Sequence, residues 1–154
     1  IMGSASDAPL AKEALAVCRE FGVPAIARVL SAHRSPEETA AFAKGVSGEG
    51  FGAILAIAGK AAHLAGVVAA QTRLPVIGVP VRSSDLGGLD ALLSTAQMPK
   101  GVPVACVAID GAANAQAIHI AASRAKLAKG TDFSGKLLVA GSKNSPASHR
   151  SSSG

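Results

Sequence analysis

Three nearly uninterrupted apolar runs constrain the fold of this chain more than any other feature. They read FGAILAIA, LPVIGVPV and GVPVACVAI, at residues 51–58, 74–81 and 101–109. Each run has the length of one strand, and none alternates polar with apolar residues as a half-exposed strand does. Continuous apolar strands are typical of parallel sheets, which helices cover on both faces. The runs therefore predict a buried parallel sheet.

Segments with apolar residues at helical spacing separate these runs. Residues 6–22 carry Asp7 as the expected N-cap, a proline in the first turn and Gly22 as a stop. The stretch SPEE at 35–38 reads as a capping box that opens a second helix. Further helices are expected over 61–72 and 111–129, a strand over 25–31, and the remainder of a first strand at residues 1–2. This alternation predicts an α/β fold, a three-layer αβα sandwich with a doubly wound, flavodoxin-like parallel sheet.

Length and charge suggest one domain followed by a tail. We expect a single α/β catalytic domain over residues 1–130, with a truncated first strand, and a basic, serine-rich tail over residues 131–154. The formal net charge of +5 arises entirely in residues 121–154, where six Lys and Arg accompany one acid. The neutral body and the lack of Tyr and Trp argue against a nucleic-acid partner.

The apolar runs and the cysteines indicate the kind of compartment. No run approaches the roughly 18–20 apolar residues that a membrane span needs, so we expect a soluble protein with no membrane partner. Cys18 and Cys106 have no nearby cysteine or histidine at metal-type spacing. We interpret both as buried, reduced thiols, which suits a cytoplasmic location.

The loops that follow the strands carry most of the polar chemistry. Right-handed crossovers place every strand-to-helix loop of a parallel sheet at one edge, where open α/β sheets bind ligands. These loops read GSASD (3–7), SAHRS (31–35), AGKAAH (58–63), VRSSD (81–85) and IDGAAN (109–114). We therefore expect a ligand site beyond the carboxyl ends of the strands.

The first two loops suggest a site for an anion. Ser4 and Ser6 offer hydroxyls beside free N–H groups at a helix start, which is an anion cradle. Asp7 has two interpretations that do not exclude each other, a helix N-cap and a hydrogen bond to ligand hydroxyls. Arg34 stands next to a second helix start and beside Ser31, and its planar guanidinium suits a phosphate.

Histidine provides the reactive group in this set. A histidine side chain can both give and take a proton at cellular pH, and His33 stands at a strand end between phosphate-type residues. His63 has two open interpretations, a second ligand contact or a packed residue bonded to backbone. The sequence has no P-loop, no Gly-x-Gly-x-x-Gly after the first strand and no metal-type cluster. We therefore expect proton transfer on a small phosphorylated ligand, without a metal or nucleotide cofactor.

Several stretches together resemble one enzyme family. MGSASD, VLSAHRSPE, AGKAAHLAGVVAA, LPVIGVPV, QMPKGVPVA and AANAQ occur in order between residue 2 and about residue 128. In combination they are similar to the PurE family in its class I form, a mutase of carboxyaminoimidazole ribonucleotide in purine biosynthesis. Class II relatives carboxylate aminoimidazole ribonucleotide directly, usually carry lysine after the histidine and lack Ala-Ala-His. Arg34 and His63 therefore favour class I.

The resemblance implies an octamer of three-layer α/β subunits, with no ATP, metal or organic cofactor. It implies that His33 is the general acid/base of the interconversion between the N5-carboxylated ribonucleotide and its C4-carboxylated isomer. The implied ligand contacts are Ser4, Ser6, Ser31 and Arg34 to the 5′-phosphate, Asp7 to the ribose hydroxyls, and Ala58, Gly59, Lys60, Ala61, His63 and Leu64 around the carboxylate and CO2.

The chain also departs from the family pattern. Ile57 and Lys60 stand where the family commonly has glycine, and Ala65 replaces a frequent proline. Lys60 could bind the carboxylate or narrow the pocket, and the sequence leaves both open. Two other functions remain as alternatives: a direct carboxylase of aminoimidazole ribonucleotide, and a non-catalytic ribonucleotide-binding paralogue.

Overall fold

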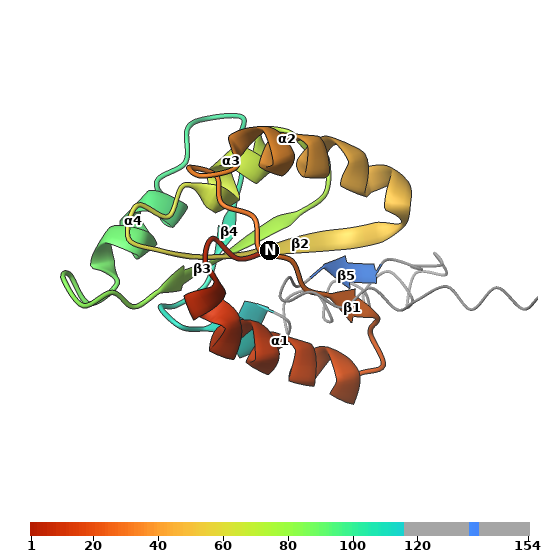
Figure 1. The fold of residues 1–154 in the computed structure, drawn as a ribbon, viewed down its shortest axis with the longest axis horizontal. Helices are drawn as coiled ribbons and strands as arrows, with labels where there is room; N and C mark the ends of the chain where they lie inside the picture. The colour runs from red at the N-terminus through yellow and green to blue at the C-terminus, as the bar shows by residue number, and fades with distance from the viewer. Residues whose placement is uncertain (116–135, 139–154) are drawn as a thin grey trace, which may run out of the picture.

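The structure, a computed structural model, describes residues 1–115 and 136–138. Its parallel strands form a five-stranded sheet in the order β1-β5-β2-β3-β4 (Figure 1). The strands are β1 (Ala25–Ile26), β2 (Phe51–Gly59), β3 (Val76–Val81), β4 (Ala105–Cys106) and β5 (Lys136–Leu138). The α-helices are α1 (Ala8–Glu20), α2 (Pro36–Gly45), α3 (Leu64–Ala69) and α4 (Leu89–Ala96), and the 3-10 helices are η1 (Ala5–Asp7) and η2 (Val46–Glu49).

Residues 1–2 occupy a strand position between β1 and β2. Met2 forms parallel bridges with Val29 on one side and Ile57 on the other. Its N–H donates to Arg28 O (3.1 Å), and its carbonyl accepts from Leu30 N–H (2.9 Å). With this segment counted as the first strand, the order matches the expected flavodoxin-like sheet, in which the chain winds to both sides of its first strand.

The segment β5 lies in the same gap, farther from the carboxyl ends of the strands. Leu137 pairs with Ala25 of β1 and with Ala53 of β2. The sequence pattern predicts these three residues in the tail over 131–154, but in the structure they belong to the sheet. The boundary at residue 130 stays a prediction, because residues 116–135 and 139–154 lie outside the described part of the chain.

Two apolar cores flank the sheet and make the three layers. Alternate residues of β2 point to opposite faces, as the pleat of a strand requires. Ile54, Ala56 and Ala58 belong to the core under α2, α3 and α4, together with Ala43, Leu64 and Ala91. Ala53, Leu55 and Ile57 pack with residues of α1, namely Ala11, Ala14 and Cys18. Figure 1 shows α1 on one side of the sheet and α2 and α3 on the other. The predicted αβα sandwich is confirmed.

Several elements differ in length from the prediction. The expected strands over 25–31 and 101–109 shorten to β1 and β4, and the helix over 61–72 shortens to α3. Helix α4 was not predicted, since Gly87 and Gly88 precede it and its polar Asp, Ser and Thr are weak helix formers. Of the helix expected over 111–129, residues 112–115 are helical and the rest lies outside the described residues.

The predicted side-chain caps are wrong in detail. Pro36 opens α2 as expected, but Ser35 makes no side-chain cap. Its hydroxyl instead accepts from Ser31 N–H (3.3 Å) and donates to Ser31 O (3.2 Å), because the loop before the helix folds back on itself. Asp7 likewise precedes α1 without capping it, and its carboxylate completes a capping box with Ser4 around η1.

None of the helices in the described part of the chain combines the length and apolar character that crossing a membrane requires. Of the two cysteines, Cys18 is buried as expected. Cys106 is half-buried, because β4 lies at the edge of the sheet and its surroundings cover the thiol only in part.

Candidate functional site

A cavity of about 540 Å³ opens at the carboxyl ends of the strands. The loops that follow residue 2, β1, β2 and β3 surround it, at the place where the chain winds away from its first strand in two directions. Such switch points are where open α/β sheets bind ligands. Every residue assigned to the site from the sequence lines the cavity: Ser4, Ser6, Asp7, Ser31, His33, Arg34, Ala58, Gly59, Lys60, Ala61, His63 and Leu64. Their roles stay predictions.

Arg34 and the neighbouring hydroxyls form a polar corner of the cavity. The Arg34 guanidinium donates to Gly3 O (2.8 Å) and to Ser31 Oγ (3.4 Å), so the β1 loop is tied to the loop after residue 2. Ser6 Oγ donates to Ser4 Oγ (2.9 Å). A positive charge and three hydroxyls at one corner make a chemically suitable receptor for a phosphate.

The carboxylate of Asp7 lies next to this corner and is buried, with 6% of the residue exposed. Its oxygens accept from Ser4 N–H (3.1 Å) and Ser6 Oγ (3.3 Å). Burial raises the pKa of Asp7 above its ordinary 3.8, while the two serines and the charge of Arg34 act in the opposite direction. Asp7 thus holds the loop after residue 2 in shape and lines the cavity.

His33 and His63 meet edge to face across the cavity. Nε2 of His33 lies 2.9 Å from Nδ1 of His63, and the ring planes are 81° apart. In such a contact one nitrogen must donate the proton that the other accepts, so each ring fixes the tautomer of the other. The pair joins the β1 loop to the start of α3. This arrangement suits a general acid/base whose proton is oriented by a second imidazole.

Small residues form the floor of the cavity after β2. Ala58, Gly59 and Ala61 present no side chain beyond a methyl group. A Cβ added at Gly59 would make an ordinary van der Waals contact with Val81 Cβ, at 3.4 Å. The floor therefore leaves room for a ligand and contributes few polar side chains.

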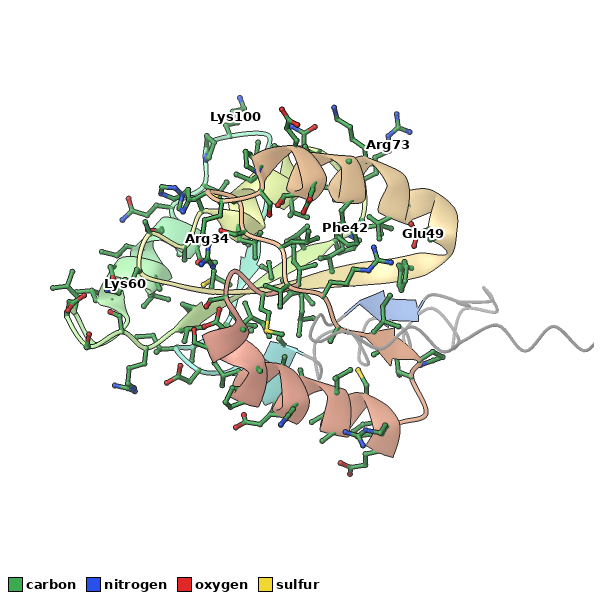
Figure 2. All side chains as sticks on the ribbon, in the orientation of Figure 1. Arg34, Phe42, Glu49, Lys60, Arg73 and Lys100 are labelled. Carbon is green, nitrogen blue, oxygen red and sulfur yellow. The ribbon has the colours of Figure 1, made fainter. Side chains whose placement is uncertain are left out.

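Two of the three departures from the family pattern, Ile57 and Lys60, lie in different places. Ile57 is fully buried in the core on the α1 side and does not line the cavity. Lys60 lines the cavity, and its ammonium donates to Asp85 Oδ2 (2.9 Å). This hydrogen bond raises the pKa of Lys60 and lowers that of Asp85. Figure 2 shows Lys60 and Arg34 toward the same end of the sheet.

The last residue of β3 and the loop after it supply further lining residues that the sequence did not assign to the site: Val81, Arg82, Ser83 and Ser84. The sequence did predict this loop at the ligand-binding edge of the sheet, which was the one indication that its residues could contact a ligand. Nothing in its pattern distinguished a ligand contact from a surface turn. Within residues 1–115 and 136–138, no group of three or more His, Cys, Asp or Glu side chains could hold a metal ion.

Comparison with known proteins gives the family. The family described as AIR carboxylase matches residues 1–131. A protein of Pyrococcus horikoshii named N5-carboxyaminoimidazole ribonucleotide mutase is 56% identical over 115 residues, which are 75% of this chain and 65% of that protein. The Mycobacterium tuberculosis protein of the same name is 57% identical, over 75% of this chain and 66% of that protein.

Two further comparisons extend this result. A Saccharomyces cerevisiae protein named phosphoribosylaminoimidazole carboxylase is 52% identical over 78% of this chain and 21% of its own length. The crystal structure of Treponema denticola PurE matches the fold with a TM-score of 0.64 at 24% identity, covering 83% of this chain and 91% of that one. The chain thus spans just under two thirds of the length of the Pyrococcus horikoshii and Mycobacterium tuberculosis proteins. By its sequence and by the sheet that carries the cavity, it belongs to the AIR carboxylase family.

Proposed function

We propose that this chain interconverts N5-carboxyaminoimidazole ribonucleotide and 4-carboxy-5-aminoimidazole ribonucleotide, as an isomerase of purine biosynthesis. The names of relatives that are 56% and 57% identical support this proposal. The observation that carries it is the place of His33, whose imidazole lies on the same cavity as Arg34 and the serine hydroxyls. A ribonucleotide held there by its phosphate has its base within the cavity.

The proposed chemistry needs one proton to move between two atoms of the base. The bond from N5 to the carboxyl carbon breaks, CO2 leaves, and N5 takes a proton from His33. C4 then forms a bond to the same CO2, and His33 accepts the proton that C4 releases. Atoms and charge balance without an added oxidant, ATP or metal. His63 orients the ring of His33 through the contact of 2.9 Å.

The remaining residues of the cavity contact three parts of the ligand. Ser4, Ser6, Ser31 and Arg34 bind the 5′-phosphate, and Asp7 accepts from the ribose hydroxyls. The segment from Ala58 to Ala61, with His63 and Leu64, surrounds the carboxyl group and the released CO2. Its small apolar side chains suit a compartment that keeps CO2 beside C4 and excludes water.

A direct carboxylase is the second candidate, and the yeast relative named phosphoribosylaminoimidazole carboxylase favours it. The two activities differ in substrate. The mutase converts the N5-carboxylated ribonucleotide without ATP and at a rate independent of added CO2. A carboxylase acts on aminoimidazole ribonucleotide, and its rate rises with CO2.

The deciding assay therefore measures formation of the C4-carboxylated isomer from each substrate, with CO2 varied. Rapid conversion of the N5-carboxylated substrate, unaffected by CO2, is expected. Turnover confined to aminoimidazole ribonucleotide and CO2 would replace the mutase by the carboxylase. Tight binding of the ribonucleotide with no turnover of either substrate would identify a non-catalytic paralogue.

An octameric assembly and a cytoplasmic location belong to the same proposal. Leu89 and Leu93 of α4 lie on one helix face and are exposed, as is Leu86 just before the helix. An apolar surface of this kind favours contact with other copies of the chain. Light scattering on the purified protein measures the mass of the assembly.

A further inference from the structure

Two ion pairs join three successive loops at the rim of the cavity. Lys60, after β2, pairs with Asp85 in the loop after β3 (2.9 Å). Arg82, in that same loop, pairs with Asp110 after β4 (3.2 Å), and its N–H also donates to Asp110 Oδ1 (2.9 Å). The loop over residues 82–88 is therefore held from both sides. We call these two pairs the rim brace.

The loop at 82–88 depends on such contacts for its position. The ladder between β2 and β3 ends at the pair Gly59–Val81, so Lys60 and Arg82 are the first residues beyond it. Gly87 and Gly88 follow, with φ of 60° and 93°, a pair of residues with wide conformational freedom. Arg82 and the serines at 83 and 84 line the cavity from this loop. Movement of the loop therefore changes one wall of the cavity.

Backbone strain coincides with the rim brace. Among the described residues, Lys60 and Asp110 are the two non-glycine residues with positive φ, at 54° and 59°. Aspartate tolerates this conformation better than most residues, whereas lysine adopts it at an energetic cost, because its Cβ clashes with the backbone. Glycine would remove that cost at position 60 but would also remove the ammonium. A strained residue beside a cavity points to a function of its side chain.

We propose that Lys60 is a positioning residue, which holds the loop at 82–88 as a wall of the cavity through its ion pair with Asp85. The ammonium is thereby held by Asp85, a residue that does not itself line the cavity. The kinetic part of this proposal rests on the proposed function. Loss of the pair lets the loop move outward, which weakens ligand binding and leaves the proton transfer at His33 intact.

The test compares variants that remove, keep or reverse the pair. Lys60→Asn tolerates positive φ and lacks the cation, Asp85→Asn removes the anion, and Lys60→Arg keeps a cation of similar reach. The first two are expected to raise KM for the ribonucleotide about two- to fivefold, the range typical of one exposed ion pair, with kcat nearly unchanged. Lys60→Arg, and the double variant Lys60→Asp with Asp85→Lys, are expected to restore KM.

Lys100→Asn is the matched control, because Lys100 is an exposed lysine on a loop that does not line the cavity (Figure 2). It is expected to leave KM unchanged. An unchanged KM in both Lys60→Asn and Asp85→Asn would overturn the proposal. So would a KM in Lys60→Arg as high as in Lys60→Asn.

Amide hydrogen exchange of residues 82–88 tests the rim brace apart from turnover. Exchange is expected to be several-fold faster in Lys60→Asn and Asp85→Asn than in the wild type and in Lys100→Asn. If the wild type shows no turnover of either substrate, the proposed function fails while this measurement still decides the role of Lys60. Equal exchange in all variants would show that the pair does not hold the loop.

Discussion

The sequence predicts the positions of some residues in this cavity better than it predicts the contacts that others make. His33, Arg34 and Ser31 fall in one loop at a strand end, where chemistry and topology point to the same place, and they line one cavity. The partner of Lys60 was unpredictable, because Asp85 is 25 positions away and no local pattern encodes such a contact. The cap at Ser35 failed for a related reason, since Ser31 competes for its hydroxyl.

Asp7 has a pH dependence that follows from its burial. Because burial raises its pKa above 3.8, the folded protein releases this proton at a higher pH than the unfolded chain does. The free energy of unfolding therefore falls as pH rises from below 3.8 through the folded-state value, and this loss persists at higher pH. Asp7→Asn cannot titrate, so its stability relative to the wild type is expected to increase over the same interval.

Thermal or urea unfolding at a series of pH values measures this difference. Asp85→Asn is the control of opposite sign, because its ion pair with Lys60 lowers the pKa of Asp85. Relative to the wild type, that variant is expected to lose stability as pH rises. A stability difference for Asp7→Asn that does not change with pH, or that shrinks as pH rises, would contradict the account of Asp7.

Among the elements, helix α4 packs closely onto β3 because Gly78 of β3 has no side chain. A Cβ added at Gly78 would lie 2.2 Å from Thr95 Cγ2 and 3.3 Å from Ala65 Cβ. Thr95 is buried, and its hydroxyl donates to Ala91 O (2.8 Å), so it cannot easily move aside. Gly78 thus sets the close contact of the sheet with α3 and with α4, the helix that follows the loop at 82–88.

Gly78→Ala is therefore expected to lower the free energy of unfolding by about 1–3 kcal/mol, as overpacking in a core does. Denaturant unfolding measures the effect. The control is Gly45→Ala at the exposed end of α2, where nothing lies within 4 Å of the added Cβ and φ is −79°. That change is expected to stabilise the protein by about 0.5–1 kcal/mol. Equal stability of Gly78→Ala and the wild type would contradict the packing described here.

At the scale of the whole molecule, the order of the strands makes the site. Residues 1–2 lie between β1 and β2, so the loops at 3–7 and 31–35 face the loops after β2 and β3 across one cavity. The apolar runs correctly predicted a parallel sheet covered on both faces, because burial on both faces leaves a clear pattern, although helix α4 was not predicted. They could not predict β5, whose short KLL follows a basic segment and has no distinct periodicity.

Proton transfer through His33 is the proposed chemistry of the cavity, and replacing this histidine tests it. The rate of isomer formation from N5-carboxyaminoimidazole ribonucleotide is measured for the wild type and for His33→Asn, together with the dissociation constant for the ribonucleotide. The variant is expected to lose at least about a hundredfold in rate, as removal of a general acid/base does, while binding changes little. A near-normal rate in His33→Asn would contradict the account.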